Sequence, residues 1–196
     1  MNITSKNCWY ETKINITSAL REDWKFPQAP NRFGVWNYKA ADIFNQMWLE
    51  YMRTLGLPVI SSILFYRDAW VTDIRAHIDI EPWDSVTPCV SGLNWIIGGK
   101  NSEMIWYETP KNLAPILLTP AGLPYQPWPV IGLTIQDKKY IMPESPTLTL
   151  VRTDVPHSID VREESRWCFS VRLQSTTMSW DEVIKSMLAR NLINER

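Results

Sequence analysis

Residues 155–173 read VPHSIDVREESRWCFSVRL, and their residue pattern is that of a β structure. Two short runs rich in β-branched and aromatic residues, 157–161 and 166–173, are separated by the turn-forming segment REES. In the second run apolar and polar residues alternate, which is the period of a strand with two different faces. The stretch therefore predicts two strands joined by a short turn.

Similar runs fill the chain from residue 59 onward, and turn-forming residues separate them. The runs are 59–67, 71–80, 90–99, 102–109, 114–119, 129–135, 138–142, 147–152, 157–161 and 166–173. No helical pattern lies between them, so βαβ units are not expected. The pattern predicts an antiparallel sandwich or a jelly roll.

Helices are predicted on both sides of this β region. Residues 38–55 have helical period and end at Gly56 and Pro58, whereas the first 35 residues look polar and irregular. The apolar face of that helix is expected to contain Ile43, Phe44, Met47, Trp48, Tyr51, Met52 and Leu55.

The last helix is predicted at 179–192, with Ser179 as N-cap and Glu182 completing a capping box. Its buried face is expected to contain Val183, Ile184, Met187 and Leu188. Residues 1–196 are then one domain: an N-terminal segment and support helix (1–58), a β core (59–173) and the C-terminal helix.

Composition narrows the class of protein. The formal net charge of −1 shows no excess of positive charge that would indicate nucleic-acid binding. No apolar run is long enough to span a membrane. The N-terminus shows no secretory signal, and the three cysteines, Cys8, Cys89 and Cys168, suit free thiols in a reducing compartment. We expect a cytoplasmic protein.

The two histidines of the chain point to a metal site. In TDIRAHIDIEPWD (72–84), His77 and Asp79 are two residues apart in a predicted strand, so their side chains share one face. His157 is the only other histidine. Two histidines and a carboxylate form the facial triad of non-haem Fe(II) oxygenases. A structural His–Asp pair is the alternative.

Arg166 lies nine residues after His157 and opens the last predicted strand. A guanidinium on an otherwise apolar strand is costly unless it meets an anion, and its planar fork suits a carboxylate. The alternative is an exposed Arg166 that pairs with Glu163 or Glu164.

With His77-x-Asp79, His157 and Arg166 in this order on short strands, the chain resembles Fe(II)- and 2-oxoglutarate-dependent dioxygenases of the small phage and bacterial type. The resemblance covers about residues 60–173. It implies a double-stranded β-helix (jelly roll, cupin-like) in which His77, Asp79 and His157 bind Fe(II). Arg166 would hold the far carboxylate of the cosubstrate 2-oxoglutarate. A virus-encoded protein acting in the host cytoplasm fits the same resemblance.

The resemblance also implies hydroxylation of an unactivated carbon, with release of succinate and CO2, because halogenating relatives have a small residue at the position of Asp79. Many members carry serine where this chain has Cys168, and a thiol is a poor hydrogen-bonding substitute. Asn94 and Tyr107 are therefore candidates for a second cosubstrate contact, and Lys100 is the alternative to Arg166.

The substrate is not readable from the sequence: a small molecule or a protein side chain would both suit. Trp83, Trp95, Trp106 and Tyr107 could line a substrate cleft, although such residues more often form core. A cupin-like jelly roll that binds metal without turnover would need no Arg166. A non-enzymatic β-sandwich interaction protein is the third hypothesis. The oligomeric state is open.

Overall fold

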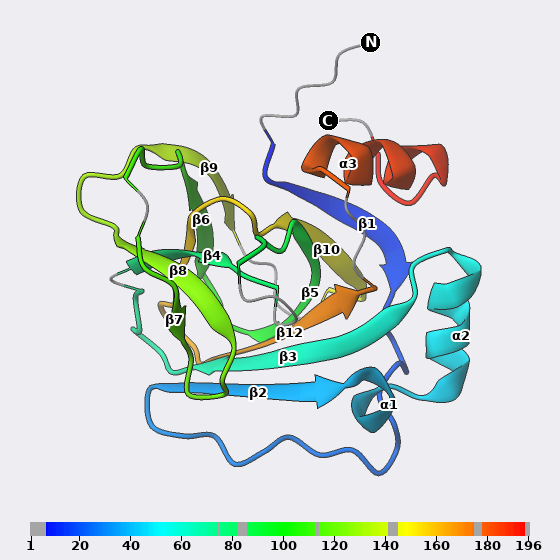
Figure 1. Ribbon diagram of the computed structural model, residues 1–196. Coiled ribbons are helices and arrows are strands. Elements are labelled where there is room, and N and C mark those ends of the chain that lie inside the picture. The colour runs from blue at the N-terminus through cyan, green and yellow to red at the C-terminus, as the bar shows by residue number, and fades with distance from the viewer. Residues whose placement is uncertain are drawn as a thin grey trace.

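The protein is mainly β, as predicted. The computed structural model describes residues 7–73, 75–81, 86–112, 114–140, 145–174 and 178–194. Two antiparallel six-stranded sheets face each other (Figure 1). The first has the order β1 (Trp9–Asn15), β10 (Thr147–Arg152), β5 (Ser91–Gly98), β12 (Arg166–Leu173), β3 (Val59–Arg67), β2 (Phe33–Lys39). The second has the order β7 (Leu117–Leu118), β8 (Pro124–Pro129), β4 (Arg75–Asp79), β11 (His157–Asp160), β6 (Glu103–Tyr107), β9 (Ile135–Tyr140).

Most runs predicted after residue 59 contain a strand, but the region between β7 and β9 differs. The predicted strand 129–135 is wrong, because residues 131 and 132 form a turn between β8 and β9. β8 itself was not predicted, since it carries Pro124, Pro127 and Pro129, which lack the N–H that a strand donates. The run 138–142 overlaps only the end of β9, and residues 141–142 lie outside the described residues.

The prediction that the first 35 residues are irregular is also wrong. β1 alternates, with Tyr10, Thr12 and Ile14 buried and the residues between them facing solvent, and it pairs with β10. Its apolar positions are too few and too scattered among polar neighbours to stand out, so tertiary pairing decides its conformation.

The helix predicted at 38–55 is split into α1 (Ala40–Ile43) and α2 (Gln46–Thr54), and β2 extends through Lys39. Asn45 caps α2: its Oδ1 accepts a hydrogen bond from the Trp48 N–H. The break changes which side chains face the core. Met47 is 78% exposed and Tyr51 39% exposed, so their predicted burial is wrong.

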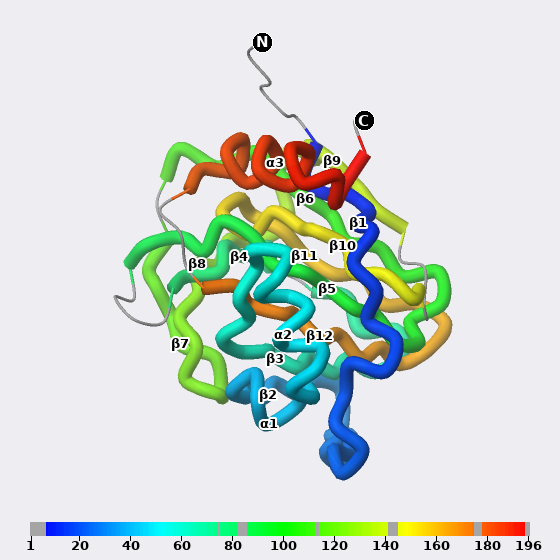
Figure 2. Tube along the Cα trace, turned by 90° about the vertical axis from the view of Figure 1, so that its right-hand side faces the viewer, coloured from blue at the N-terminus to red at the C-terminus, as the bar shows by residue number. Residues whose placement is uncertain are grey.

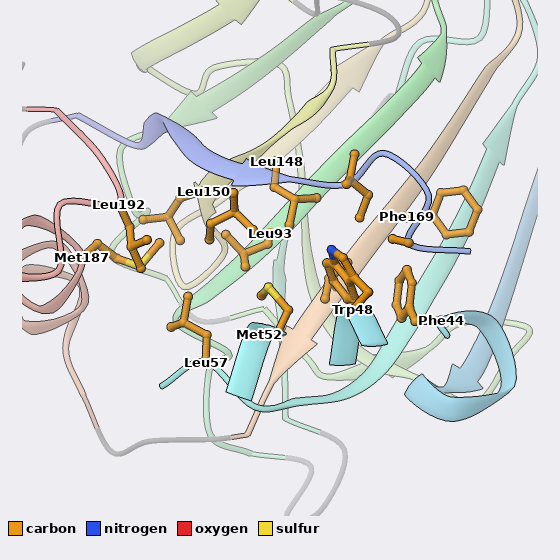
Figure 3. Packing of buried hydrophobic residues seen from close by; sticks show 14 of the residues in the cluster. Phe44, Trp48, Met52, Leu57, Leu93, Leu148, Leu150, Phe169, Met187 and Leu192 are labelled. Atoms are coloured by element: carbon orange, nitrogen blue, oxygen red, sulfur yellow. The ribbon is translucent and has the colours of Figure 1, made fainter. Parts of the chain in front are cut away.

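The helices cover the outer face of the first sheet (Figures 1 and 2). α3 (Trp180–Ala189) begins after Ser179 with the predicted capping box, in which the Ser179 N–H donates to Glu182 Oε2 at 2.7 Å, but it ends at Ala189 and not at residue 192. Figure 3 shows how side chains of α2, α3 and the sheet form the main apolar cluster. No helix within the described ranges is long and apolar enough to cross a membrane.

The inner face of the first sheet is polar by comparison. On β12, Phe169 and Val171 face the helices, whereas Arg166, Cys168, Ser170 and Arg172 share the opposite face and are all buried. The main apolar core therefore lies outside the sandwich, and the space between the sheets contains buried charge.

Candidate metal centre

β4 places two candidate ligands on the inner face of the second sheet. His77 and Asp79 are two residues apart, so both side chains project to the same side. Ile78 between them packs on the other side, in a small apolar cluster with Ile80 and Trp128. Ile74 and residues 82–85, on either side of this strand, lie outside the described residues.

β11 brings His157 beside them. β11 pairs with β4 in antiparallel register, and the Cα atoms of His157 and His77 are direct partners. Their ring centroids are 4.5 Å apart. The structure thus joins three side chains that the sequence separates by up to 80 positions.

The three side chains converge on one point. His77 Nε2 lies 3.5 Å from Asp79 Oδ1, and His157 Nε2 lies 4.0 Å from the same oxygen. One ligand atom from each residue falls within 4.8 Å of the others, a spacing that can hold a metal ion. Two imidazole nitrogens and one carboxylate oxygen are the donor set that the sequence predicted for Fe(II).

Both histidines favour the neutral form that binds metals. Burial, with His77 beside it, lowers the pKa of His157 to about 4, and burial also lowers the pKa of His77. The His157 Nδ1 lies 3.0 Å from the Val155 carbonyl oxygen. An Nδ1–H that donates to this oxygen leaves the Nε2 lone pair directed toward Asp79.

Arg172, which the sequence reasoning did not select, holds the carboxylate. Its Nη2 donates to Asp79 Oδ2 at 2.5 Å, and its Nη1 donates to Cys89 Sγ at 3.2 Å. Burial alone would raise the pKa of Asp79, but Arg172 and the two histidines hold it well below its usual value. Oδ2 is thus engaged by the guanidinium, and Oδ1 faces the imidazoles.

Arg166 is buried, so the alternative of an exposed pair with Glu163 or Glu164 is wrong. It is 2% exposed, and its Nε has no hydrogen-bond partner. It lies opposite Arg67 in the β12–β3 register, and Arg67 Nη2 is 3.0 Å from Asp73 Oδ2. Asp73 therefore balances one of two neighbouring guanidinium groups, and the pair keeps a net positive charge.

The other predicted cosubstrate contacts are placed differently. Asn94 faces the interior opposite Ser170, is 8% exposed, and its Oδ1 has no hydrogen-bond partner. Tyr107 Oη lies 2.9 Å from Ser158 Oγ, on the face of its sheet opposite to His157, so it is not brought to the triad. Lys100 is exposed and pairs with Glu163 at 3.3 Å, away from the interior.

A cavity of about 770 Å³ opens beside the triad. His77, Asp79 and Arg172 line it, and aromatic walls come from Phe33 and Phe65, among others. Of the predicted cleft aromatics, Trp95 stacks on Phe169 on the outer face, Trp106 is fully buried, and Trp83 is outside the described residues. Arg166 and Asn94 line a separate space of about 20 Å³.

Sequence reasoning selected the three residues that the structure brings together, and the buried Arg166, but did not select Arg172, Arg67 or Asp73. The alternation of β12 already put Arg172 on the same face as Arg166, which was the available signal. No protein-family model matches the chain, and neither a curated protein nor a solved structure matches it.

Proposed function

We propose that this protein is an Fe(II)- and 2-oxoglutarate-dependent oxygenase that hydroxylates an unactivated carbon. The observation that carries the proposal is the convergence of His77, Asp79 and His157 between two sheets, next to a cavity large enough for an organic substrate. A structural His–Asp pair would need neither the third ligand nor the cavity.

The strand pairing supports a double-stranded β-helix. Early strands pair with late ones in nested order: β3 with β12, β4 with β11 and β5 with β10. Such nesting across two sheets is how a jelly roll winds, and it brings the strands of the two histidines together. The hairpin that contains β7 and β8 extends the second sheet beyond this core.

The residues present fit an iron ion. His77 and His157 offer neutral nitrogens, and Asp79 offers one oxygen while Arg172 occupies the other. This donor set leaves coordination positions for further ligands, as oxygen-activating iron requires. Neighbouring residues that hydrogen-bond to the ligand side chains and orient them also typically raise the affinity for a metal.

The buried arginines of the interior would suit one carboxylate of a dicarboxylate cosubstrate. Arg166 and Arg67 face inward side by side, and among the described acids Asp73 forms an ion pair with Arg67, so a further carboxylate beside Arg166 would balance the second buried guanidinium. When bound, iron would activate dioxygen, which is the oxidant, while 2-oxoglutarate would supply two electrons and leave as succinate and CO2. The protein's own groups would orient the ligands and exclude water.

One observation favours a second candidate, a cupin-like jelly roll that binds a metal or a small ligand without oxidation. Arg166 does not line the large cavity but the small separate space beside Asn94. In that case Arg166 would serve only the packing of the interior.

Anaerobic addition of Fe(II) and then 2-oxoglutarate distinguishes these functions. We expect a weak visible charge-transfer band, which Asp79→Ala removes and the exposed Lys100→Gln keeps. Metal binding without the band would support the second candidate. Absence of metal binding in the wild-type protein would instead favour a non-enzymatic interaction protein.

A further inference from the structure

Two of the four arginines that line the large cavity, Arg75 and Arg190, pair with no acid among the described residues. Arg67 pairs with Asp73 and Arg172 pairs with Asp79, while Arg190 donates to the carbonyl oxygens of Leu55 and Gly56. Arg75 also lines the cavity. Within the part of the chain that the structure describes, no carboxylate lies within ion-pair distance of Arg75.

Arg75 is placed to contact a ligand that lies in the cavity beside the candidate metal centre. Arg75, His77 and Asp79 occupy alternate positions of β4 and therefore project from the same face. All three line the same cavity. A group held by Arg75 would thus lie one strand repeat from the first metal ligand, at about 7 Å along the strand.

The rest of the cavity is suited to an apolar body. Its walls include Phe33, Phe65, Leu123 and Ile63, and more of its surface is apolar than polar. Counting all charged side chains that line it, four arginines face three carboxylates, and a divalent metal would add further positive charge. A neutral or cationic ligand would gain no favourable interaction from this positive charge.

We propose that the cavity binds an organic anion with an apolar body, whose carboxylate or phosphate is recognised by Arg75. This ligand is the substrate class of the proposed oxygenase, and in that respect the inference rests on the proposed function. Binding itself needs neither iron nor turnover, so it can be measured separately.

A matched pair of fluorescent probes tests the charge requirement. 1-Anilinonaphthalene-8-sulfonate and N-phenyl-1-naphthylamine share the aromatic body and differ by the sulfonate. We expect the metal-free protein to bind the anionic probe about tenfold more tightly, the scale of a charge-assisted hydrogen bond. Arg75→Gln should remove this preference, and Arg75→Lys should retain part of it.

Two comparisons locate the site and name the anion. Ile63→Trp, which narrows the cavity, should weaken both probes, whereas Lys100→Gln should change neither. Displacement of the anionic probe by decanoate, decyl phosphate and decanol then separates carboxylate from phosphate recognition. Equal displacement by decanol, or an unchanged preference in Arg75→Gln, would overturn the proposal. Either result would leave the iron and 2-oxoglutarate band as an independent test of the oxygenase.

Discussion

Arg172 of one sheet donates a hydrogen bond from Nη2 to Oδ2 of Asp79 in the other, at 2.5 Å. The contact joins the two layers at the candidate metal centre. It also gives the two carboxylate oxygens different partners, because Oδ1 remains directed toward His77 and His157. The guanidinium would thus act on a bound metal through Asp79, as a positioning residue.

Replacing Arg172 should weaken metal binding without removing any ligand. We expect Arg172→Gln to lower the affinity for Co(II), measured by titration calorimetry, by roughly 10- to 100-fold, the usual effect of losing a residue that orients a ligand. Arg162→Gln is the matched control, since this exposed arginine pairs with Asp160 outside the centre. Equal affinities in both variants would show that Asp79 needs no such support.

Removing any one ligand should have a larger effect. We expect His77→Ala, Asp79→Ala and His157→Ala each to abolish tight metal binding and 2-oxoglutarate turnover, because two remaining donors hold Fe(II) poorly. The exposed Asp23→Ala should behave as the wild type. A variant that still releases succinate at the wild-type rate would exclude its residue from the triad.

The sequence was sufficient for the local geometry of the triad but not for its assembly. Strand alternation alone puts His77 and Asp79 on one face. That His157 becomes the neighbour of His77 depends on the pairing of β4 with β11, a long-range contact that no local pattern encodes. The order of the motif residues suggested it only by family resemblance.

The missed elements have physical reasons of their own. Alternation assigned Arg166 and Arg172 to one face of β12, but it cannot say which guanidinium reaches across to the other sheet. The prolines of β8 made this segment look unlike a strand. In β1 the polar residues between the buried ones obscured the strand pattern, and only its pairing with β10 shows that it is a strand. Strand pairing and burial in the assembled fold, which decide these cases, are not encoded in a local pattern.

Arg166 should control the affinity for the cosubstrate more than the rate. If it holds the far carboxylate, Arg166→Gln should raise the apparent KM for 2-oxoglutarate by about tenfold or more, the scale of a lost charge-assisted hydrogen bond. The kcat at saturation should change less. Arg166→Lys should recover part of the affinity, and Lys100→Gln should match the wild type. An unchanged KM in Arg166→Gln would show that another residue holds the far carboxylate of 2-oxoglutarate.

Replacing the neighbouring arginines Arg67 and Arg166 should have opposite effects on the free energy of unfolding. Arg67→Met leaves Asp73 without its partner and should cost about 3–5 kcal/mol of unfolding free energy. Arg166→Met removes a buried guanidinium that forms no ion pair with the described acids, so the metal-free protein should be equally stable or more stable. Urea unfolding of both variants measures the difference. A large loss of stability in Arg166→Met would reveal that its charge is compensated within the protein.

The Arg67–Asp73 pair should also make stability depend on pH. Burial alone would raise the pKa of Asp73, but Arg67, His77 and the Ile159 N–H, which donates to Oδ2 at 3.0 Å, hold it below its usual value. A carboxyl group whose pKa is lower in the folded state stabilises the protein above its unfolded pKa, near pH 4, and loses this effect as the pH falls further. Wild type should therefore exceed Asp73→Asn in unfolding free energy at pH 7, and the difference should shrink between pH 4 and pH 2. The exposed Glu22→Gln should show no such convergence. A difference between wild type and Asp73→Asn that stays constant over this range would mean that the charge of Asp73 does not stabilise the fold.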